Sequence, residues 1–239
     1  MKKLIVITCL LISVTSVAQS MFGKNPYKNQ QRFDQQRVHW GYFLGFNSYD
    51  YKINYTEGYE LKNGGQEIQV KTTTGFNVGM VGNLRLNGYL DLRFEPGLYY
   101  GKKTLFFPQL AGSGILSNTR TINSTYINFP LLLKFSAVRA GNIRPYLVGG
   151  FSQSLNLASN ETSKDDNYAG KFRVKKWSTN YELGLGIDFY FEHFKFTPSI
   201  RGVFGINDEL VRDRSELSPW TGGIESMKTR AVLVNFTFH

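Results

Sequence analysis

The sequence contains almost no cysteine, and the one it has lies near the start of the chain. Cys9 is the single cysteine among 239 residues. It belongs to an apolar run, Leu4–Ile12, that follows two lysines and precedes the small residues Ser16–Ala18. This order is typical of a secretory signal peptide, which we place at residues 1–18. The expected mature chain is then free of cysteine, which excludes disulfides and thiolate metal sites.

Long apolar runs are also missing. After residue 18, no run approaches the roughly 20 apolar residues that a membrane-spanning helix needs. Aromatic residues are plentiful instead, at 15% of the chain with 19 Phe and 14 Tyr, and there are 24 Gly. This composition favours strands over helices. If the mature chain lies in a membrane, a closed barrel is the one spanning structure left.

Acidic residues are too few to balance the basic ones. Without the two lysines of the signal peptide, 26 Lys+Arg oppose 18 Asp+Glu, which leaves a net charge of +8. Such an excess suits nucleic acid, anionic lipid or an acidic partner. Because the basic residues are scattered and the chain is expected to be exported, we expect no nucleic-acid partner. Residues 19–37 form a polar, aperiodic stretch that we interpret as a periplasmic N-terminal extension.

Eight stretches of the remaining chain alternate with a period of two, which is the pattern of β-strands. They lie near residues 38–47, 75–81, 90–99, 126–135, 144–157, 181–189, 196–205 and 231–238. Large apolar residues occupy one face of each stretch except the fifth, whose two faces are ambiguous. Glycines and ionised residues share the opposite face. The outer face of a soluble fold would explain the charges, but glycines suit a crowded interior, so a barrel that is apolar outside and polar inside fits better.

The connections between these stretches alternate between short and long. Short ones lie around residues 87–88, 140–142 and 192–193, and long polar ones at about 54–72, 102–122, 158–174 and 207–227. Outer-membrane barrels have short periplasmic turns and longer outer loops. We therefore predict an all-β fold, an eight-stranded antiparallel transmembrane β-barrel over residues 38–239, in the bacterial outer membrane with both termini periplasmic. Bulges or strand ends are expected at some of its four strand prolines, Pro96, Pro130, Pro145 and Pro198.

Ionised residues on the predicted inner face form a candidate lumen charge network. The seven are Asp91, Arg93, Glu95, Lys134, Glu182, Asp188 and Arg201. An eight-stranded barrel is just wide enough for side chains to fill its interior. Because an unpaired buried charge is strongly unfavourable, we expect the four acidic and three basic groups to pair. The pattern thus favours a solid core over a conducting channel.

The surface is then where such a barrel would act. Possible partner contacts are Arg32 and Arg37 in the extension and Phe106, Phe107 and Trp220 in the outer loops, although these three could equally pack loop on loop. The three histidines lie outside the predicted outer loops, and neither a phosphate-loop motif nor clustered metal spacing occurs. A catalytic site needs a base beside a nucleophile. We therefore expect no enzymatic activity, no cofactor and no metal site.

Four stretches of the sequence together resemble a known family. Phe33–Gly45, Leu90–Leu98, Asn128–Phe135 and Arg144–Tyr146 are similar to the PorT family of outer-membrane barrels from the Bacteroidetes, and the likeness covers most of residues 33–239. The resemblance implies an accessory role in type IX protein secretion, which in some bacteria also serves gliding motility. It implies other secretion-machinery proteins as partners, beside outer-membrane lipid. A structural or adhesive barrel and a small-solute channel stay open as alternatives, and the oligomeric state is not predicted.

Overall fold

The computed structural model describes residues 28–59, 66–110, 118–163, 172–215 and 218–239. The expected signal peptide and the first part of the N-terminal extension lie outside these residues. The described chain is built of antiparallel strands, with two short 3-10 turns at Phe33–Gln35 and Pro108–Leu110. Within the described residues, no helix has the length and apolar character needed to cross a membrane.

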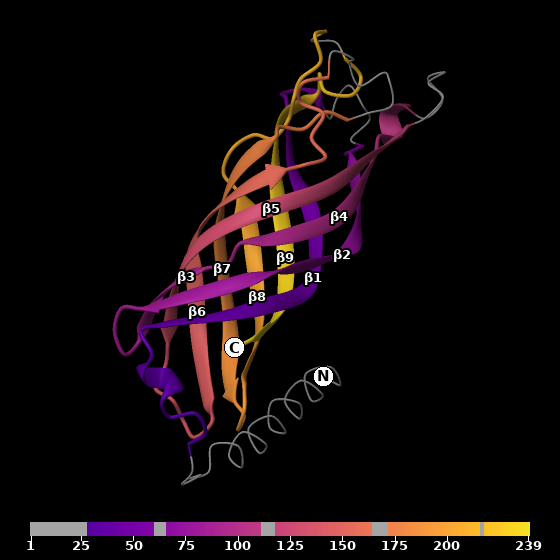
Figure 1. Cartoon of the computed structure of the whole chain (residues 1–239). Coiled ribbons are helices and arrows are strands. Elements are labelled where there is room, and N and C mark those ends of the chain that lie inside the picture. The colour runs from indigo at the N-terminus through magenta and orange to yellow at the C-terminus, as the bar shows by residue number, and fades with distance from the viewer. Residues whose placement is uncertain (1–27, 60–65, 111–117, 164–171, 216–217) are drawn as a thin grey trace, which may run out of the picture.

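The strands close into a ring, as Figure 1 shows. They are β1 (Val38–Tyr55), β2 (Gln69–Arg85), β3 (Leu90–Phe94), β4 (Gly97–Phe106), β5 (Thr119–Ser136), β6 (Ile143–Asn156), β7 (Trp177–Tyr190), β8 (Lys195–Gly205) and β9 (Ile224–Phe238). All pairings are antiparallel: β3 and β4 each pair with β2 and β5, the other strands pair with their sequence neighbours, and β1 closes the ring by pairing with both β2 and β9. The predicted all-β antiparallel barrel is confirmed.

The ring has nine strands where eight were expected, because one predicted strand is divided. β3 and β4 both lie between β2 and β5, and they are separated only by Glu95 and Pro96. Proline has no N–H to donate to a ladder, and a strand therefore tends to end at such a residue, as it does at Pro96. Pro130, Pro145 and Pro198 remain inside β5, β6 and β8. The wall therefore still makes eight passes around the ring.

The two ends of the barrel differ in their connections. Four- to six-residue connections at 86–89, 137–142 and 191–194 lie at one end, which we call the turn end. The connections at 56–68, 107–118, 157–176 and 206–223 lie at the other, which we call the loop end. The first residue of β1 and the last of β9 are both at the turn end. The alternation of short and long connections is thus as predicted.

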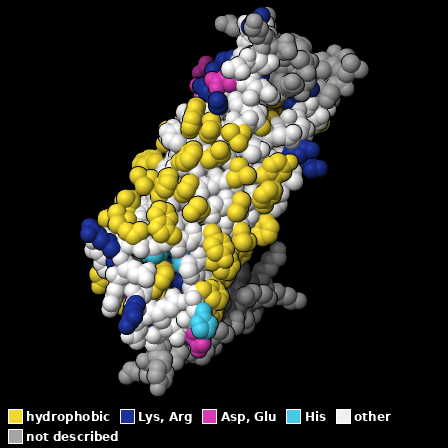
Figure 2. Space-filling view, in the orientation of Figure 1, with side chains coloured by type: hydrophobic (Ala, Val, Ile, Leu, Met, Phe, Trp, Pro, Cys, Tyr) yellow, Lys and Arg dark blue, Asp and Glu magenta, His cyan; other side chains and the backbone are white. Residues whose placement is uncertain are grey.

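The strands run farther toward the loop end than the sequence pattern suggested. In the first half of β1, Trp40, Leu44 and Phe46 point outward and are exposed, whereas Asp50 and Lys52 take the outward positions beyond Ser48. About 9–11 residues of tilted strand cross a bilayer, and β1 and β5 each have 18. The wall therefore continues beyond its apolar belt, which Figure 2 shows around the middle of the visible face.

The inner face changes in the opposite sense along the same strand. Inward positions of β1 pass from Gly45 and Asn47 to Tyr49, Tyr51 and Ile53 toward the loop end. The expected loops at 54–72 and 102–122 were too long for this reason. Outside the apolar belt the alternation persists with polar residues outward and apolar residues inward, so the pattern of a lipid-facing strand is lost while the strand itself continues.

The inward glycine Gly45 lies where the wall leaves no room for a side chain. A Cβ on Gly45 would collide with the backbone carbonyl of Val234 on β9, whereas one on Gly88 would meet nothing within 4 Å. We expect Gly45→Ala to lower the free energy of unfolding by about 1–3 kcal/mol, the usual effect of overpacking. Gly88→Ala is the matched control and should change it by less than about 0.5 kcal/mol. Urea titration in detergent micelles measures both, and equal effects would contradict the explanation.

Candidate functional site

All seven residues of the predicted lumen charge network point into the barrel. Their exposed fractions range from 1% for Glu182 and Asp188 to 8% for Asp91. They come from β3, β5, β7 and β8, with Glu95 in the break between β3 and β4. The strand alternation places them there, since each lies on the inward parity of its strand. The network has two centres, one at Glu95 and one at Asp188.

Glu95 joins two arginines that come from opposite sides of the ring. Its Oε1 lies 3.0 Å from Nη1 of Arg93, and its Oε2 lies 2.7 Å from Nη1 of Arg201. Arg201 also reaches Glu182, with 2.9 Å between Nε and Oε2. Arg93 donates a further hydrogen bond of 2.7 Å from Nε to Oδ1 of Asn83. Two carboxylates and two guanidinium groups thus compensate one another across the lumen.

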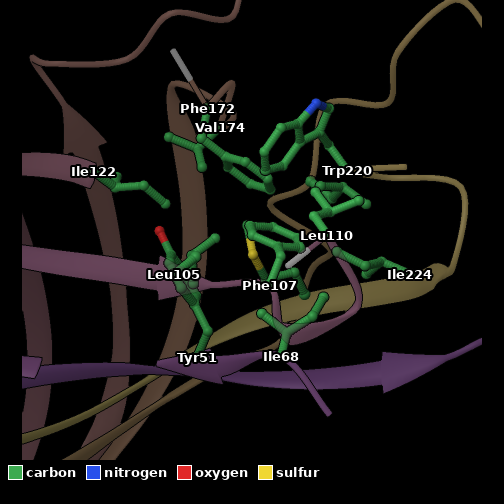
Figure 3. Packing of buried hydrophobic residues seen from close by; sticks show 12 residues of the cluster. Tyr51, Ile68, Leu105, Phe107, Leu110, Ile122, Phe172, Val174, Trp220 and Ile224 are labelled. Atoms are coloured by element: carbon green, nitrogen blue, oxygen red, sulfur yellow. The ribbon is translucent and has the colours of Figure 1, made fainter. Parts of the chain in front are cut away.

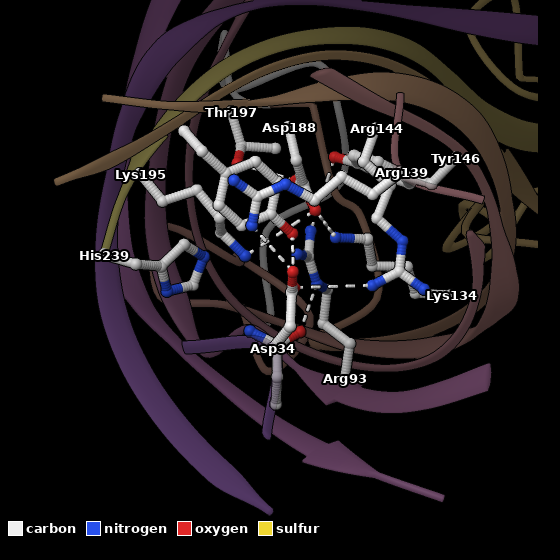
Figure 4. A network of polar contacts seen from close by, with 12 residues as sticks. Asp34, Arg93, Lys134, Arg139, Arg144, Tyr146, Asp188, Lys195, Thr197 and His239 are labelled. Atoms are coloured by element: carbon white, nitrogen blue, oxygen red, sulfur yellow. Dashed lines mark hydrogen bonds and ion pairs between the residues drawn. The ribbon is translucent and has the colours of Figure 1, made fainter. Parts of the chain in front are cut away.

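Asp188 is the second centre, and Figure 4 shows the side chains that converge around it inside the ring. Its Oδ2 lies 2.6 Å from Nζ of Lys134 and 3.6 Å from Nζ of Lys195. The hydroxyl of Thr197 donates a 2.8 Å hydrogen bond to its Oδ1. The ammonium of Lys134 also lies 4.1 Å from the ring centre of Tyr146, where a cation–π contact adds to the ion pair.

Lys195 was missed by the sequence analysis although it is buried and carries charge. With Lys195 included, four acidic groups face four basic ones. The signal was present, because Lys195 has the same parity on its strand as Thr197 and Arg201, but the apolar run used to define that strand began one residue later. Asp91 lies opposite Lys134 in the register of β3 and β5, and it has no ion pair within 4.0 Å among the described residues.

Part of the N-terminal extension closes the turn end of the lumen. Asp34 accepts a 2.7 Å hydrogen bond from Nη1 of Arg139 and a 2.8 Å hydrogen bond from the hydroxyl of Tyr190. The backbone N–H of Asn29 donates to Asn142, at 2.9 Å. The ring of Phe33 lies 4.6 Å from Nζ of Lys195, directly under the Asp188 centre. We call residues 29–36 the turn-end closure.

Almost no free space separates the turn-end closure from the charges above it. The cavity between them, lined by Asp34, Asp91, Lys134 and Asp188 among others, has a volume of about 10 Å³. That volume holds at most about one water molecule. Dense side-chain packing of this kind leaves no water-filled path past the Asp188 centre.

At the loop end the lumen is filled by hydrocarbon instead of charge. A cluster of buried apolar residues, which we call the apolar cap, is drawn in Figure 3. It consists of Tyr51, Ile68, Leu105, Phe107, Leu110, Ile122, Phe172, Val174, Leu210, Trp220, Ile224 and Met227. Phe107 and Trp220 pack edge to face with ring centres 4.9 Å apart. The side chains come from four strands and all four long connections, so the cap ties the loop end together.

The proposed partner contacts divide between enclosed and accessible residues. Phe107 and Trp220 are buried in the apolar cap, as packing of loop on loop requires, so neither presents a surface to a partner in this structure. Phe106 is half-buried and lines an open groove of about 650 Å³ beside Pro108. Arg32 and Arg37 are exposed. Three of the five residues therefore remain accessible.

Between the charges and the apolar cap lies a lysine held by aromatic rings. Lys103 is fully buried, and its Nζ lies 3.7 Å from the ring centre of Tyr51 and 5.5 Å from that of Tyr126. Glu209, in the connection after β8, accepts a 3.0 Å hydrogen bond from the hydroxyl of Thr229. Burial raises the pKa of Glu209 above its ordinary value, and the nearby Lys103 and the bonds from Thr229 offset this only in part.

The lumen residues have the arrangement of a structural core rather than of a reactive site. Within the described residues, no group of three His, Cys, Asp or Glu side chains is placed to hold a metal ion. His39 and His239 lie together at the turn end, with ring centres 5.1 Å apart, and His239 contacts the backbone carbonyl of Trp40. Three of the four lumen carboxylates, those of Glu95, Glu182 and Asp188, pair with arginine or lysine, so the network holds the wall together from within.

Removing one charge from the Glu95 centre tests this role. Glu95→Gln leaves Arg93 and Arg201 without their shared carboxylate, and we expect the free energy of unfolding to fall by about 3–5 kcal/mol. Asp50→Asn is the matched control, since Asp50 pairs with Arg230 on the outer surface of the wall and should cost at most about 1 kcal/mol. Urea titration in detergent micelles compares the two. Similar losses for both variants would show that the buried network does not stabilise the barrel.

Comparisons with known proteins agree with this architecture. A family model described as outer membrane protein beta-barrel domain matches residues 18–211. Among curated proteins, none matches the chain.

Three solved structures that are similar to the chain have low sequence identity to it. The N-terminal β-barrel domain of OprF from Pseudomonas aeruginosa is 14% identical, with a TM-score of 0.39 over 84% of this chain and 98% of that one. OprG from Pseudomonas aeruginosa is 13% identical, with a TM-score of 0.44 over 84% and 94%. Ail from Yersinia pestis, solved with the heparin analogue sucrose octasulfate, is 11% identical, with a TM-score of 0.40 over 85% and 99%. TM-scores below 0.5 at these identities say nothing about function.

The family match covers most of the chain, and the closed ring has the apolar outer wall and polar interior that are typical of bacterial outer-membrane barrels. The chain therefore belongs to the family of outer membrane protein β-barrel domains.

Proposed function

We propose that this chain is a non-enzymatic outer-membrane barrel that acts through protein contacts as an accessory component of type IX protein secretion. One observation supports the choice of mechanism, namely that buried side chains occupy the lumen at the turn end, at the two charge centres and at the loop end. The turn-end closure, the two charge centres and the apolar cap follow one another inside the ring. A barrel that encloses no passage works through its outer surface and its two ends.

The assignment to secretion rests on the resemblance to the PorT family. Its four stretches supply Asp34, Arg93, Lys134, Arg144 and Tyr146, five of the side chains that meet in Figure 4. Arg144, for example, lies 3.7 Å from Asp34 of the turn-end closure. The resemblance is therefore concentrated where the extension docks on the barrel, which supports a shared way of closing the turn end.

The orientation is part of the proposal. Short connections face the periplasm in outer-membrane barrels and long ones face outward. We place the turn end in the periplasm, so that both termini lie there. Arg32 and Arg37 then present positive charge to periplasmic components of the secretion machinery, beside the turn-end closure.

A second candidate is a structural or adhesive barrel whose loop end is the working part. The wall that projects beyond the apolar belt favours it, because Asp50, Lys52 and Asn54 present a polar surface outside the lipid. A small-solute channel fits least well, since about 10 Å³ of free volume lies at the Asp188 centre.

Electrical recording tests the filled lumen. The purified full chain, reconstituted in a planar bilayer, is expected to give no steady conductance, because paired charges and the apolar cap occupy the path. Protein-free micelles added to the same bilayer are the control. A steady large conductance that appears only with the protein would overturn the mechanism and favour the channel.

Genetics tests the secretion role. Deleting the gene should lower the amount of cargo released to the medium and reduce gliding, and the full chain supplied in trans should restore both. A complementing copy with Arg32→Ala and Arg37→Ala should restore less, although both side chains are exposed and the barrel should fold as before. Cargo release and gliding that are unchanged by the deletion would refute the role.

A further inference from the structure

The wall has an opening between β1 and β2 on the loop-end side of the apolar belt. The two strands pair from Val38↔Leu84 as far as Ser48↔Thr74. Beyond that point Tyr49–Tyr55 of β1 pair only with β9, and Gln69–Thr73 of β2 pair only with β4. Figure 1 shows the two strands diverging toward the loop end. Two strand edges therefore face each other without a ladder between them.

Backbone groups of β1 point into this opening. In an antiparallel ladder a residue's N–H and C=O point to the same side, and successive residues alternate. The carbonyl of Arg37 accepts from the N–H of Arg85 on β2, so odd-numbered residues of β1 face β2. Tyr51 and Ile53 have this parity and lie beyond the last pair, whereas the N–H of Tyr49 still belongs to the ladder beside the Ser48↔Thr74 pair. The N–H of Tyr51 donates a 2.7 Å hydrogen bond to the side chain of Asp50, so the N–H of Ile53 and the carbonyls of Tyr51 and Ile53 are the groups that face the opening.

The space between the two edges is a groove of about 750 Å³. Tyr51 and Ile53 line it from one side and Ile68 and Val70 from the other. Tyr51 and Ile68 belong to the apolar cap, and Ile53 and Val70 pack against it, so part of the floor of the groove is hydrocarbon between polar walls. Tyr55 bridges the far end, where its hydroxyl accepts a 2.9 Å hydrogen bond from the N–H of Ile68.

We propose that this groove is a docking site for an extended polypeptide segment of a partner protein, which adds to the free edge of β1 as a further strand. A strand edge presents donors and acceptors at the spacing of another polypeptide backbone, and a partner strand is the ligand that satisfies them. Alternate side chains of such a segment would rest on the apolar floor. The inference stands on the strand edges alone and does not depend on the role in type IX secretion.

Charge around the groove favours a segment with basic side chains. Asp50, Glu57 and Glu67 line it against Lys52 and Arg230, which leaves one excess negative charge. The chain as a whole has a net charge of +10. The rim of the groove is therefore acidic relative to its surroundings, and a cationic segment is attracted to it more than a second copy of this basic chain is.

Peptide binding to the full chain in detergent micelles tests the proposal. The probe is a fluorescein-labelled heptapeptide, Lys-Val-Thr-Val-Thr-Val-Lys, whose residues favour the extended conformation. Saturable binding is expected by fluorescence anisotropy. The control peptide has the same side chains with every internal amide N-methylated, which removes the donors of both its edges. We expect its binding to be at least tenfold weaker.

A pair of substitutions at one position separates the backbone edge from the side chain. Ile53→Pro removes the N–H that points into the groove, and proline is tolerated on an edge strand whose donor has no ladder partner. Ile53→Ala shortens the side chain but keeps the N–H. The proline variant should bind the peptide at least tenfold more weakly than the wild type, and the alanine variant within about threefold. Circular dichroism and urea midpoints establish that both are folded.

Hydrogen exchange on the wild-type chain gives a readout that needs no variant. The amide of Ile53 should exchange quickly without peptide and slow down at least fivefold with it. The amides of Asp50 and Lys52, which face β9, should exchange slowly in both cases.

Three results would overturn the proposal. They are binding that is absent up to millimolar peptide, binding that is equal for the methylated peptide, and exchange at Ile53 that the peptide leaves unchanged. Dimers of the full chain that form without peptide and are lost in Ile53→Pro would make a second copy the occupant, and would likewise overturn the partner assignment.

Discussion

Charge pairing inside a closed wall is the interaction on which this structure depends. A barrel in hydrocarbon has to satisfy its polar groups internally, because the lipid supplies neither donors nor counter-ions. Glu95 and Asp188 do this by each holding two cations that approach from different strands. Each centre thereby links parts of the wall that are far apart in the sequence, and the ring is held from within as well as by its backbone ladders.

The same constraint explains why both ends are closed by different chemistry. At the turn end the ionised layer continues outward, so a carboxylate from the extension, Asp34, completes it with Arg139 and Tyr190. The loop end lies beyond the apolar belt and is surrounded by water. Burial of apolar side chains away from water therefore stabilises a hydrophobic core there. Phe107 and Trp220 are part of that core, which is why two loop residues that looked suited to a partner are enclosed.

The strands continue beyond the apolar belt, and this leaves part of the edges of β1 and β2 unpaired at the surface. Beyond Ser48 and Thr74 the wall no longer needs to be sealed against lipid, and β1 and β2 separate there. A gap in the ladder at membrane depth would expose backbone groups to hydrocarbon at a cost of several kcal/mol for each. Outside the apolar belt water satisfies these groups, so an unpaired edge is tolerated and is open to another chain.

From the sequence alone one could predict the number of passes, the inward and outward faces of most strands, and the seven charges of the lumen. These follow from local alternation, because side chains of a strand point to opposite faces whatever the partner strand is. The faces of β6 were ambiguous because Gly149 and Gly150 occupy both. Lys195 and the outer halves of β1 and β4 were missed because the apolar signal stops before the strand does.

The assembled fold was needed to learn which charges meet, which segments close the two ends, and where the wall opens. Glu95 and Arg201 are 106 residues apart, and Asp34 and Tyr190 are 156 apart. Such pairings depend on the shear and closure of the whole ring, which no local pattern encodes. The opening between β1 and β2 likewise depends on the residue at which the two strands stop pairing with each other. That residue is set by the register between strands, which is a property of the assembled barrel rather than of either strand alone.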